Sequence, residues 1–227
     1  MWAIFKKEFR NYFLSPVGYV VIGILLAIFG LFFYLTAIAT GSIELGGLYY
    51  YTAFYGIIIV VPILTMRMFS EERKNGTEQL LLISPVSITG IVFAKLLAAL
   101  SVIGITLLFT LMFFCIVSFF GEPNLLIVLF AIFGFLLVAL AGLSVGMLAS
   151  SITENQIIAG AITIAFLIIS LFLQSSGGIF RNLCLMSFYE KFPSGLVSIS
   201  EIVGLISFSL VFILFTIMVM QRRKAVK

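Results

Sequence analysis

The sequence contains no histidine and no aspartate, and only 10% of its 227 residues are charged. Without histidine there is no imidazole acid–base catalysis, no histidine metal ligand and no Ser-His-Asp arrangement. Without aspartate the chain cannot be an intramembrane protease of the class that uses catalytic aspartates. We therefore expect neither a catalytic site nor a metal site. A soluble domain carries about 25% charged residues, so this chain cannot form an ordinary water-exposed surface.

What the sequence has in abundance is apolar residues, at 63% of the chain and a mean hydropathy of +1.29. These residues form six long runs separated by short polar connections. The 17–38 run rises about 33 Å as a helix, enough to cross a hydrocarbon core of roughly 30 Å. We predict an all-α integral membrane protein with a single transmembrane domain over 1–227. Its six spans are expected at about 17–38, 50–66, 91–119, 125–149, 156–173 and 202–220.

Aromatic residues recur at spacings of three and four over residues 1–16, with cationic residues between them. This pattern predicts an amphipathic helix lying in the membrane interface. A signal peptide is the alternative, but the next apolar run is too long for one and has no small-residue cleavage site. The expected interface anchors are Trp2, Phe5, Lys6, Lys7, Phe9 and Arg10.

The positions of lysine and arginine predict the orientation of the chain. With six spans, 11 of the 13 cationic residues fall on one side, counting Lys95, which we expect to extend its side chain to that surface. Only Arg181 and Lys191 fall on the other side. Both termini and the 67–90 loop are therefore predicted to be cytoplasmic, in a bacterial or archaeal inner membrane.

The spans carry no charged residue near their middle, which is unusual for an ion-coupled carrier. Their polar groups are hydroxyls, which we interpret as bonding to their own helix or to a neighbouring helix. Gly142, Gly146 and Ser150 recur every four residues in the fourth span. Such a face permits close helix packing and does not by itself indicate a dimer.

The 67–90 loop is the longest polar interruption on the predicted cytoplasmic side. Arg67, Glu71 and Lys74 are spaced to pair along one helical face that continues from the second span. Gly76 is expected to end this helix, because glycine tolerates a left-handed backbone.

A second short helix is expected over 77–84, with Thr77 as its cap and Glu78 in its first turn. Pro85 disfavours helix in the residue before it and so ends the helix. This helix displays Leu80, Leu81 and Leu82. On physical grounds these leucines fit either a groove on a partner protein or the membrane surface.

The 174–201 loop on the opposite side is rich in apolar residues. It predicts short helices that turn back into the outer leaflet and cover the bundle; the alternative is an ordinary loop with an apolar surface. Ser198 and Glu201 have the spacing of a capping box that would start the last span.

Residues 71–86, EERKNGTEQLLLISPV, resemble the loop after the second span of ABC-2 type permeases, the membrane subunits of one class of ABC transporters, which also carry a lysine in the next span, here Lys95. Residues 150–156 and 187–195 are similar to that family's loop between spans four and five and to its outer segment before span six. The outer segment is most similar to the gliding-motility and nitrous-oxide-reductase-maturation branch, which more often has His in place of Lys191.

The resemblance implies a permease subunit of an exporter whose ATPase is a separate chain; this chain has no G-x-x-x-x-G-K-[ST] motif of its own. ATP and Mg²⁺ would bind to that partner. The expected partners are two ATPase subunits, a second identical or different permease, the bilayer and an accessory periplasmic or membrane protein, without nucleic acid.

The implied ATPase-docking residues are Glu71, Glu72, Arg73, Gly76, Thr77, Glu78, Leu80, Leu81, Leu82 and Pro85. The implied second cytoplasmic loop has Thr153, Glu154, Asn155 and Gln156, and the outer segment has Phe188, Tyr189, Phe192 and Gly195.

Two other function classes fit the sequence. One is a membrane anchor or mechanical-coupling subunit that transports nothing itself, because a docking helix would serve it equally well. The other is an ion-coupled carrier, which the absence of mid-span charge disfavours. The sequence does not specify a substrate.

Overall fold

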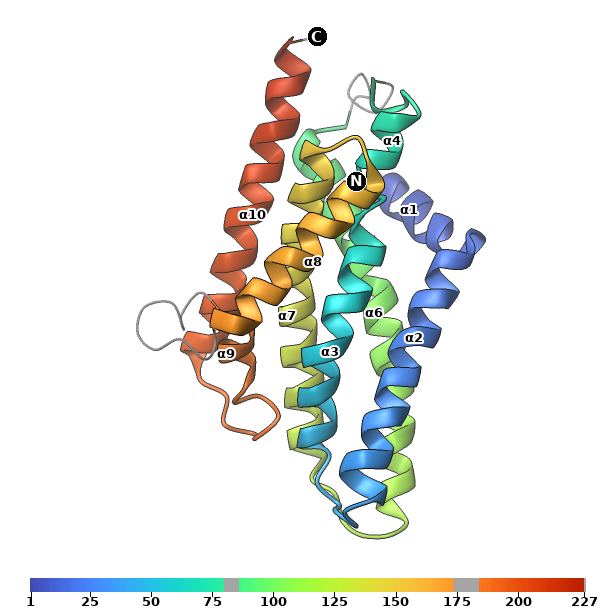
Figure 1. Ribbon diagram of the computed structural model, residues 1–227, viewed down its shortest axis with the longest axis vertical. Coiled ribbons are helices and arrows are strands. Elements are labelled where there is room, and N and C mark those ends of the chain that lie inside the picture. Colours follow the sequence, from blue (N-terminus) through green and yellow to red (C-terminus); the bar gives the residue numbers. More distant parts are fainter. Residues whose placement is uncertain (80–85, 174–183, 227) are drawn as a thin grey trace.

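A computed structural model describes residues 1–79, 86–173 and 184–226. Over these residues every regular element is a helix (Figure 1). The helices are α1 (Trp2–Leu14), α2 (Pro16–Phe33), the π-helix η1 (Tyr34–Ile38) that continues α2, α3 (Gly46–Thr65), α4 (Ser70–Lys74), α6 (Ile88–Ser118), α7 (Leu125–Ile152), α8 (Gln156–Phe172), α9 (Leu185–Tyr189) and α10 (Ile199–Val226).

Five segments of the described chain are long and apolar enough to cross a membrane. They are Pro16–Ile38, Gly46–Lys74, Ile88–Ser118, Leu125–Ile152 and Ile199–Lys224. The fifth predicted span corresponds to α8, an apolar helix of 17 residues. At 1.5 Å per residue α8 is about 26 Å long, slightly less than the roughly 30 Å core. The predicted all-α membrane fold is confirmed.

Helices α3 and α7 form the centre of the bundle. In the apolar stretches of the α3 and α7 spans, 61% and 50% of the residues are buried within the protein, against 28% in those of α2 and α10. The small-residue face of α7 allows this approach: a Cβ at Gly146 would lie 2.2 Å from the Thr65 hydroxyl oxygen of α3. A Cβ at Gly142 would lie 3.4 Å from Val61. The face predicted from the sequence to allow close packing is therefore used within this chain.

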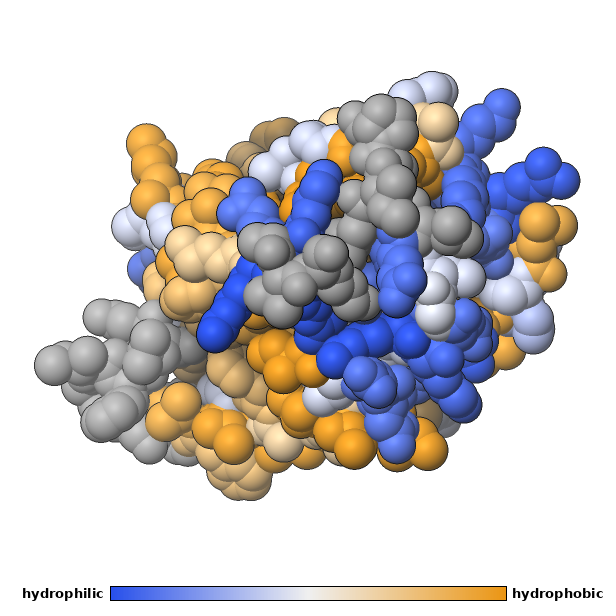
Figure 2. All heavy atoms as spheres, turned by 90° about the horizontal axis from the view of Figure 1, so that it is seen from above, coloured by the Kyte–Doolittle hydropathy of each residue, from blue (hydrophilic) through white to orange (hydrophobic). Residues whose placement is uncertain are grey.

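The chain ends and the polar segments gather at one end of the bundle, the upper end in Figure 1. This end comprises α1, residues 66–79, residues 152–155 and the C-terminal end of α10, and we call it the basic end. Figure 2, which looks onto it, shows hydrophilic residues grouped across this face and hydrophobic residues at its margins. The grouping matches the distribution of lysine and arginine in the sequence.

Several hydroxyl groups within the helices bond as the sequence predicts, whereas the buried Thr52 hydroxyl of α3 has no hydrogen-bond partner among the described residues. Thr106 and Thr163 donate to the carbonyls of Val102 and Ala159, four residues earlier, at 3.0 and 2.8 Å. A hydrogen bond of 3.0 Å also joins the hydroxyls of Tyr49 on α3 and Thr110 on α6. These bonds satisfy polar groups that would otherwise be costly in an apolar environment.

At the opposite end, α9 and the residues after it pack back onto the bundle. Tyr189 and Phe192 are fully buried, and the Tyr189 hydroxyl donates to the Ala131 carbonyl of α7 at 3.3 Å. Phe192 covers Gly134, where a Cβ would lie 2.5 Å from its ring. Gly195 ends the turn with φ of +73°. Figure 1 shows α9 part-way along α7, well short of the lower ends of α2 and α3.

One half of the predicted capping box forms at the start of α10, through the Glu201 side chain. The Ser198 N–H donates to Glu201 Oε2 at 2.9 Å, and the Ser198 hydroxyl also contacts that carboxylate. Lys191 pairs with the other oxygen of Glu201 at 2.7 Å. This ion pair spans ten residues and fixes the turn before α10.

The structure corrects one expectation for the loop after α3. The helix does not continue from the second span, because a turn over 66–69 separates α3 from α4. No ion pair joins Arg67, Glu71 and Lys74 in the described residues. The expected end of α4 is confirmed: Asn75 follows it, and Gly76 has φ of +72°.

Candidate functional site

Three elements of the basic end meet at one buried lysine. Lys95 of α6 lies 3.1 Å from Glu8 of α1 and 2.9 Å from Glu72 of α4, measured from Nζ to Oε1 in each pair. We call these three residues the lysine cluster. The Lys95 side chain is only 2% exposed, and its Nζ also lies 5.3 Å from the centroid of the Phe69 ring.

This arrangement differs from the expectation that Lys95 extends to the membrane surface. Two carboxylates compensate its charge inside the protein, so the long side chain does not need to reach water. Removal of Lys95 would leave two neighbouring, mostly buried carboxylates without a cation, so the lysine links α1 and α4 to α6.

A second contact attaches α1 to the end of α3. The Tyr12 hydroxyl donates to the Leu64 carbonyl at 3.2 Å. Burial raises the pKa of the Tyr12 phenol, with the nearby carboxylates of Glu8 and Glu71 adding to the effect. The phenol therefore stays protonated and remains a donor at neutral pH.

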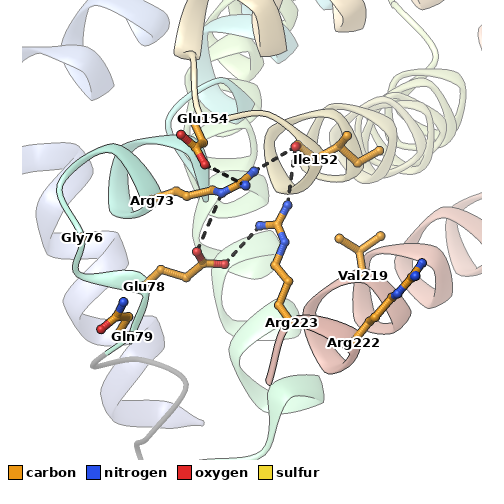
Figure 3. A pocket seen from close by; sticks show the side chains of 9 residues that line it. All are labelled: Arg73, Gly76, Glu78, Gln79, Ile152, Glu154, Val219, Arg222 and Arg223. Atoms are coloured by element: carbon orange, nitrogen blue, oxygen red, sulfur yellow. Dashed lines mark hydrogen bonds and ion pairs between the residues drawn. The ribbon is translucent and has the colours of Figure 1, made fainter. Parts of the chain in front are cut away.

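On the other side of α4, charged residues from four segments form a chain of ion pairs (Figure 3). Arg73 lies 2.8 Å from Glu154 and 4.0 Å from Glu78, and Arg223 of α10 lies 3.1 Å from Glu78. We call these four residues the arginine cluster. Glu78 is the most buried member, with a side chain 8% exposed, whereas Glu154 is 67% exposed.

Both arginines also bond to the end of α7. Arg73 Nη1 and Arg223 Nη2 donate to the Ile152 carbonyl at 2.9 and 3.4 Å. Cations are favourable there because the last carbonyls of a helix carry partial negative charge. The cluster lines a pocket of about 720 Å³, which Arg222 and Val219 also border.

Ser150, the last small residue of the α7 face, fixes the position of α4. Its hydroxyl oxygen accepts from the backbone N–H groups of Phe69 and Ser70 at 3.0 and 3.1 Å. These are N–H groups at the start of a helix, which have no partner within that helix. A side chain from α7 thus supplies the cap that α4 lacks in its own sequence.

The predicted second loop lies beside this site. Glu154 belongs to the arginine cluster. Asn155 caps α8 by accepting from the Ile157 N–H at 2.9 Å, and Gln156 begins that helix. Thr153 donates to the Ala149 carbonyl at 3.2 Å.

The predicted docking residues fall into three groups. The first group points into the two clusters and comprises Glu72, Arg73 and Glu78. In the second group Thr77 and Gly76 are exposed and Glu71 is partly exposed. The Thr77 hydroxyl donates to the Glu72 carbonyl at 3.2 Å. The remaining docking residues lie outside the described residues: Leu80, Leu81, Leu82 and Pro85.

The predicted interface anchors lie on α1. Trp2 stacks on Phe5 and Phe5 on Phe9, with ring centroids 5.2 and 5.9 Å apart. The three cationic anchors of this helix are exposed: Lys6, Lys7 and Arg10.

Three residues of the site escaped the sequence analysis: Glu8, Ser150 as a cap, and Arg223. The only signal for Glu8 was a lone acid among the aromatics and cations of α1, and Arg223 was counted only for its charge. Their partners lie 87, about 80 and 145 residues away in sequence. In the described residues no group of three or more Cys or Glu is placed to hold a metal ion.

Comparison with known families and proteins bears on what this site serves. A sequence model of the family described as ABC-2 family transporter protein matches residues 37–209, about three quarters of the chain. A search of curated proteins finds no match. The family match supports the resemblance seen in the sequence, while the gliding-motility branch stays a prediction. The chain belongs to the ABC-2 family of transporter proteins, and it is a multi-pass membrane protein of the permease kind.

Proposed function

We propose that this chain is the membrane subunit of an ATP-driven exporter and that its basic end receives a separate ATPase. Family membership implies an ATPase partner in general. The observation that carries the proposal is the convergence of four helices on residues 70–79. Helices α1, α6 and α10 reach the segment through the two ionic clusters, and α7 reaches it through hydrogen bonds of Ser150 and Ile152. If a partner protein binds this segment, contacts between the segment and the membrane helices are needed to transmit its motion to them.

In this proposal the basic end faces the cytoplasm. The helix predicted over 77–84 enters a groove of the ATPase, with Leu80, Leu81 and Leu82 as its apolar contacts. Glu71 and Thr77, which are accessible, contact the partner directly. Glu72 and Glu78 act from within by holding the segment in position.

The complete unit would contain two ATPase chains and two permease chains, either identical or different. Closure of the ATPase pair on ATP and Mg²⁺ would push on the 70–79 segment. α1 would lie in the membrane interface, with its aromatic residues in the acyl region and its cations near the headgroups. The segment around α9 would cover the far side, where an accessory periplasmic or membrane protein could bind.

Docking is tested by co-purification with the partner ATPase. Leu81→Asp places a charge in the proposed contact and is expected to abolish co-purification, because an unpaired carboxylate would be buried in an apolar groove. Leu196→Asp is the matched control, since Leu196 is 71% exposed at the opposite end. Equal recovery of ATPase with both variants would contradict docking through 77–84.

Orientation and activity are tested separately. In a Cys115→Ser background, Lys74→Cys should react with an impermeant thiol reagent only from the cytoplasmic side, and Glu44→Cys only from the outside. ATP-dependent movement of a substrate in vesicles would establish transport. ATPase binding without any flux would favour the anchor or mechanical-coupling alternative.

A further inference from the structure

The last turn of α10 carries two adjacent arginines with different surroundings. Arg223 is 21% exposed and points at the 70–79 segment, whereas Arg222 is exposed. Figure 3 shows the two guanidinium groups pointing in different directions, as expected for adjacent residues on a helix of 3.6 residues per turn. Within the described residues, Arg222 has no ion pair.

Glu78 is the residue that Arg223 holds. Its carboxylate is nearly buried, and Arg223 at 3.1 Å is closer to it than Arg73 at 4.0 Å. A buried carboxylate requires a hydrogen-bonded cation. Since Glu78 lies two residues before Leu80, in the first turn of the proposed docking helix, its position determines where that helix begins.

Arg223 joins this segment to a closely packed pair of helices. Its second terminal nitrogen, Nη2, donates to the Ile152 carbonyl at the end of α7. α10 also packs along α7 more extensively than any other pair of helices in the described chain. One guanidinium therefore connects the 70–79 segment, α7 and α10.

We infer that Arg223 is a positioning residue for coupling: it holds Glu78 against the α7–α10 pair, so that displacement of the 70–79 segment is transmitted to α10. The inference rests on the proposed function, because it names the membrane helices that receive the motion. Attraction to anionic headgroups would involve Arg222 and Arg223 equally. The inference assigns Arg223 a further role that Arg222 does not have.

The link is tested first in the permease alone. Arg223→Gln and Arg222→Gln remove the same charge from the same helix. We expect Arg223→Gln to speed backbone hydrogen exchange over residues 71–79 about tenfold, the usual size for a lost bond to a charged group. Arg222→Gln should change it by less than about twofold. Equal effects of the two substitutions would overturn the inference.

A second variant separates this link from a general loss of folding. Arg223→Lys keeps a cation within reach of Glu78 and should restore most of the protection, and Glu78→Gln should reproduce the effect of Arg223→Gln. Exchange in α3 should be unchanged in all of these variants. Increased exchange throughout the bundle, or no rescue by lysine, would refute a positioning role.

Transmission is then tested in the complex with the ATPase. Spin labels at Lys74→Cys and Lys224→Cys, in the Cys115→Ser background, should give one narrow distance distribution with and without ATP. Arg223→Gln should broaden it, and Arg222→Gln should not. A broad distribution in the parent protein would overturn the inference and leave docking intact. Failure of the ATPase to bind would instead contradict the proposed function, while the exchange data on the permease alone would still decide the Arg223 link.

Discussion

The two ends of the bundle are held together by different chemistry. At the basic end, segments far apart in sequence meet through charged side chains, in the lysine and arginine clusters. At the opposite end, α9 and the following turn are fixed by buried aromatic rings that lie on glycines, with one ion pair between residues ten positions apart.

This difference indicates which end can rearrange. An aromatic ring on a glycine is a close fit, and shifting it opens a void or creates a clash. A partly exposed ion pair can lengthen or exchange partners at a cost of about 1 kcal/mol or less. We therefore expect the opposite end to move as a body with α7. At the basic end we expect the exposed Arg73–Glu154 pair to change its contacts as the ATPase works, while Arg223 keeps Glu78 in place against α10.

The largest effect should come from Lys95→Met. This substitution leaves Glu8 and Glu72 close together and without their cation, which should lower the free energy of unfolding by about 3–5 kcal/mol. Chemical unfolding in detergent measures it, with Lys74→Met as the exposed control, expected to change stability by less than about 0.5 kcal/mol.

The triple variant Glu8→Gln, Glu72→Gln, Lys95→Met removes all three charges and should recover most of that loss. If the triple variant is as unstable as Lys95→Met, the cluster contributes through its shape rather than its charges. The basic end would then resemble the opposite end.

A smaller loss is expected from Gly134→Ala. The new Cβ would lie 2.5 Å from the buried Phe192 ring, and overpacking of this kind costs about 1–3 kcal/mol. Gly23→Ala in α2 is the control, since no heavy atom lies within 4 Å of its added Cβ. Thermal unfolding of both variants should show a lower midpoint for Gly134→Ala only. An unchanged midpoint would mean that the opposite end is loosely packed.

Ser150→Ala should cost about 0.5–2 kcal/mol, the range for a lost helix cap, because the Phe69 and Ser70 N–H groups lose their acceptor. Ser151→Ala is the matched control, because its hydroxyl donates only to the Leu148 carbonyl of its own helix. Hydrogen exchange over 69–74 should rise in Ser150→Ala alone. A rise in both would refute the capping role.

The smallest effect is that of salt. Raising ionic strength from 0.1 to 1 M shortens the screening length from about 10 to about 3 Å. Exchange over 71–79 should rise by less than about fivefold, because salt screens mainly the exposed Arg73–Glu154 pair, worth about 1 kcal/mol or less, and acts much less on the buried Lys95–Glu72 pair. Exchange over 185–192 should stay constant. Equal sensitivity at both ends would remove the contrast between them.

Local pattern was sufficient for much of this fold. The apolar runs predicted the helices, the glycine spacing predicted the close packing of α7, and Ser198 with Glu201 predicted the start of α10. Each of these signals lies within one continuous stretch of sequence. They describe one helix and its ends, which is what periodicity and capping encode.

The functional site depends on partners that no local pattern records. Lys95 looked like a residue for the membrane surface because the sequence does not show that Glu8 approaches it from α1. Arg223 looked like one of several equivalent tail cations until the fold placed it beside Glu78. Family resemblance pointed to residues 71–86 as a unit, but not to which acids face inward.

The closeness of α3 and α7 has a consequence for assembly. Thr65 and Val61 of α3 already occupy the small-residue face of α7. A second permease therefore cannot pack on that face without displacing α3 from its own subunit. Oligomer contacts must instead be sought on the helices left most open to lipid, α2 and α10 among them. The number of permease chains in the complex is thus determined by contacts between its outer helices.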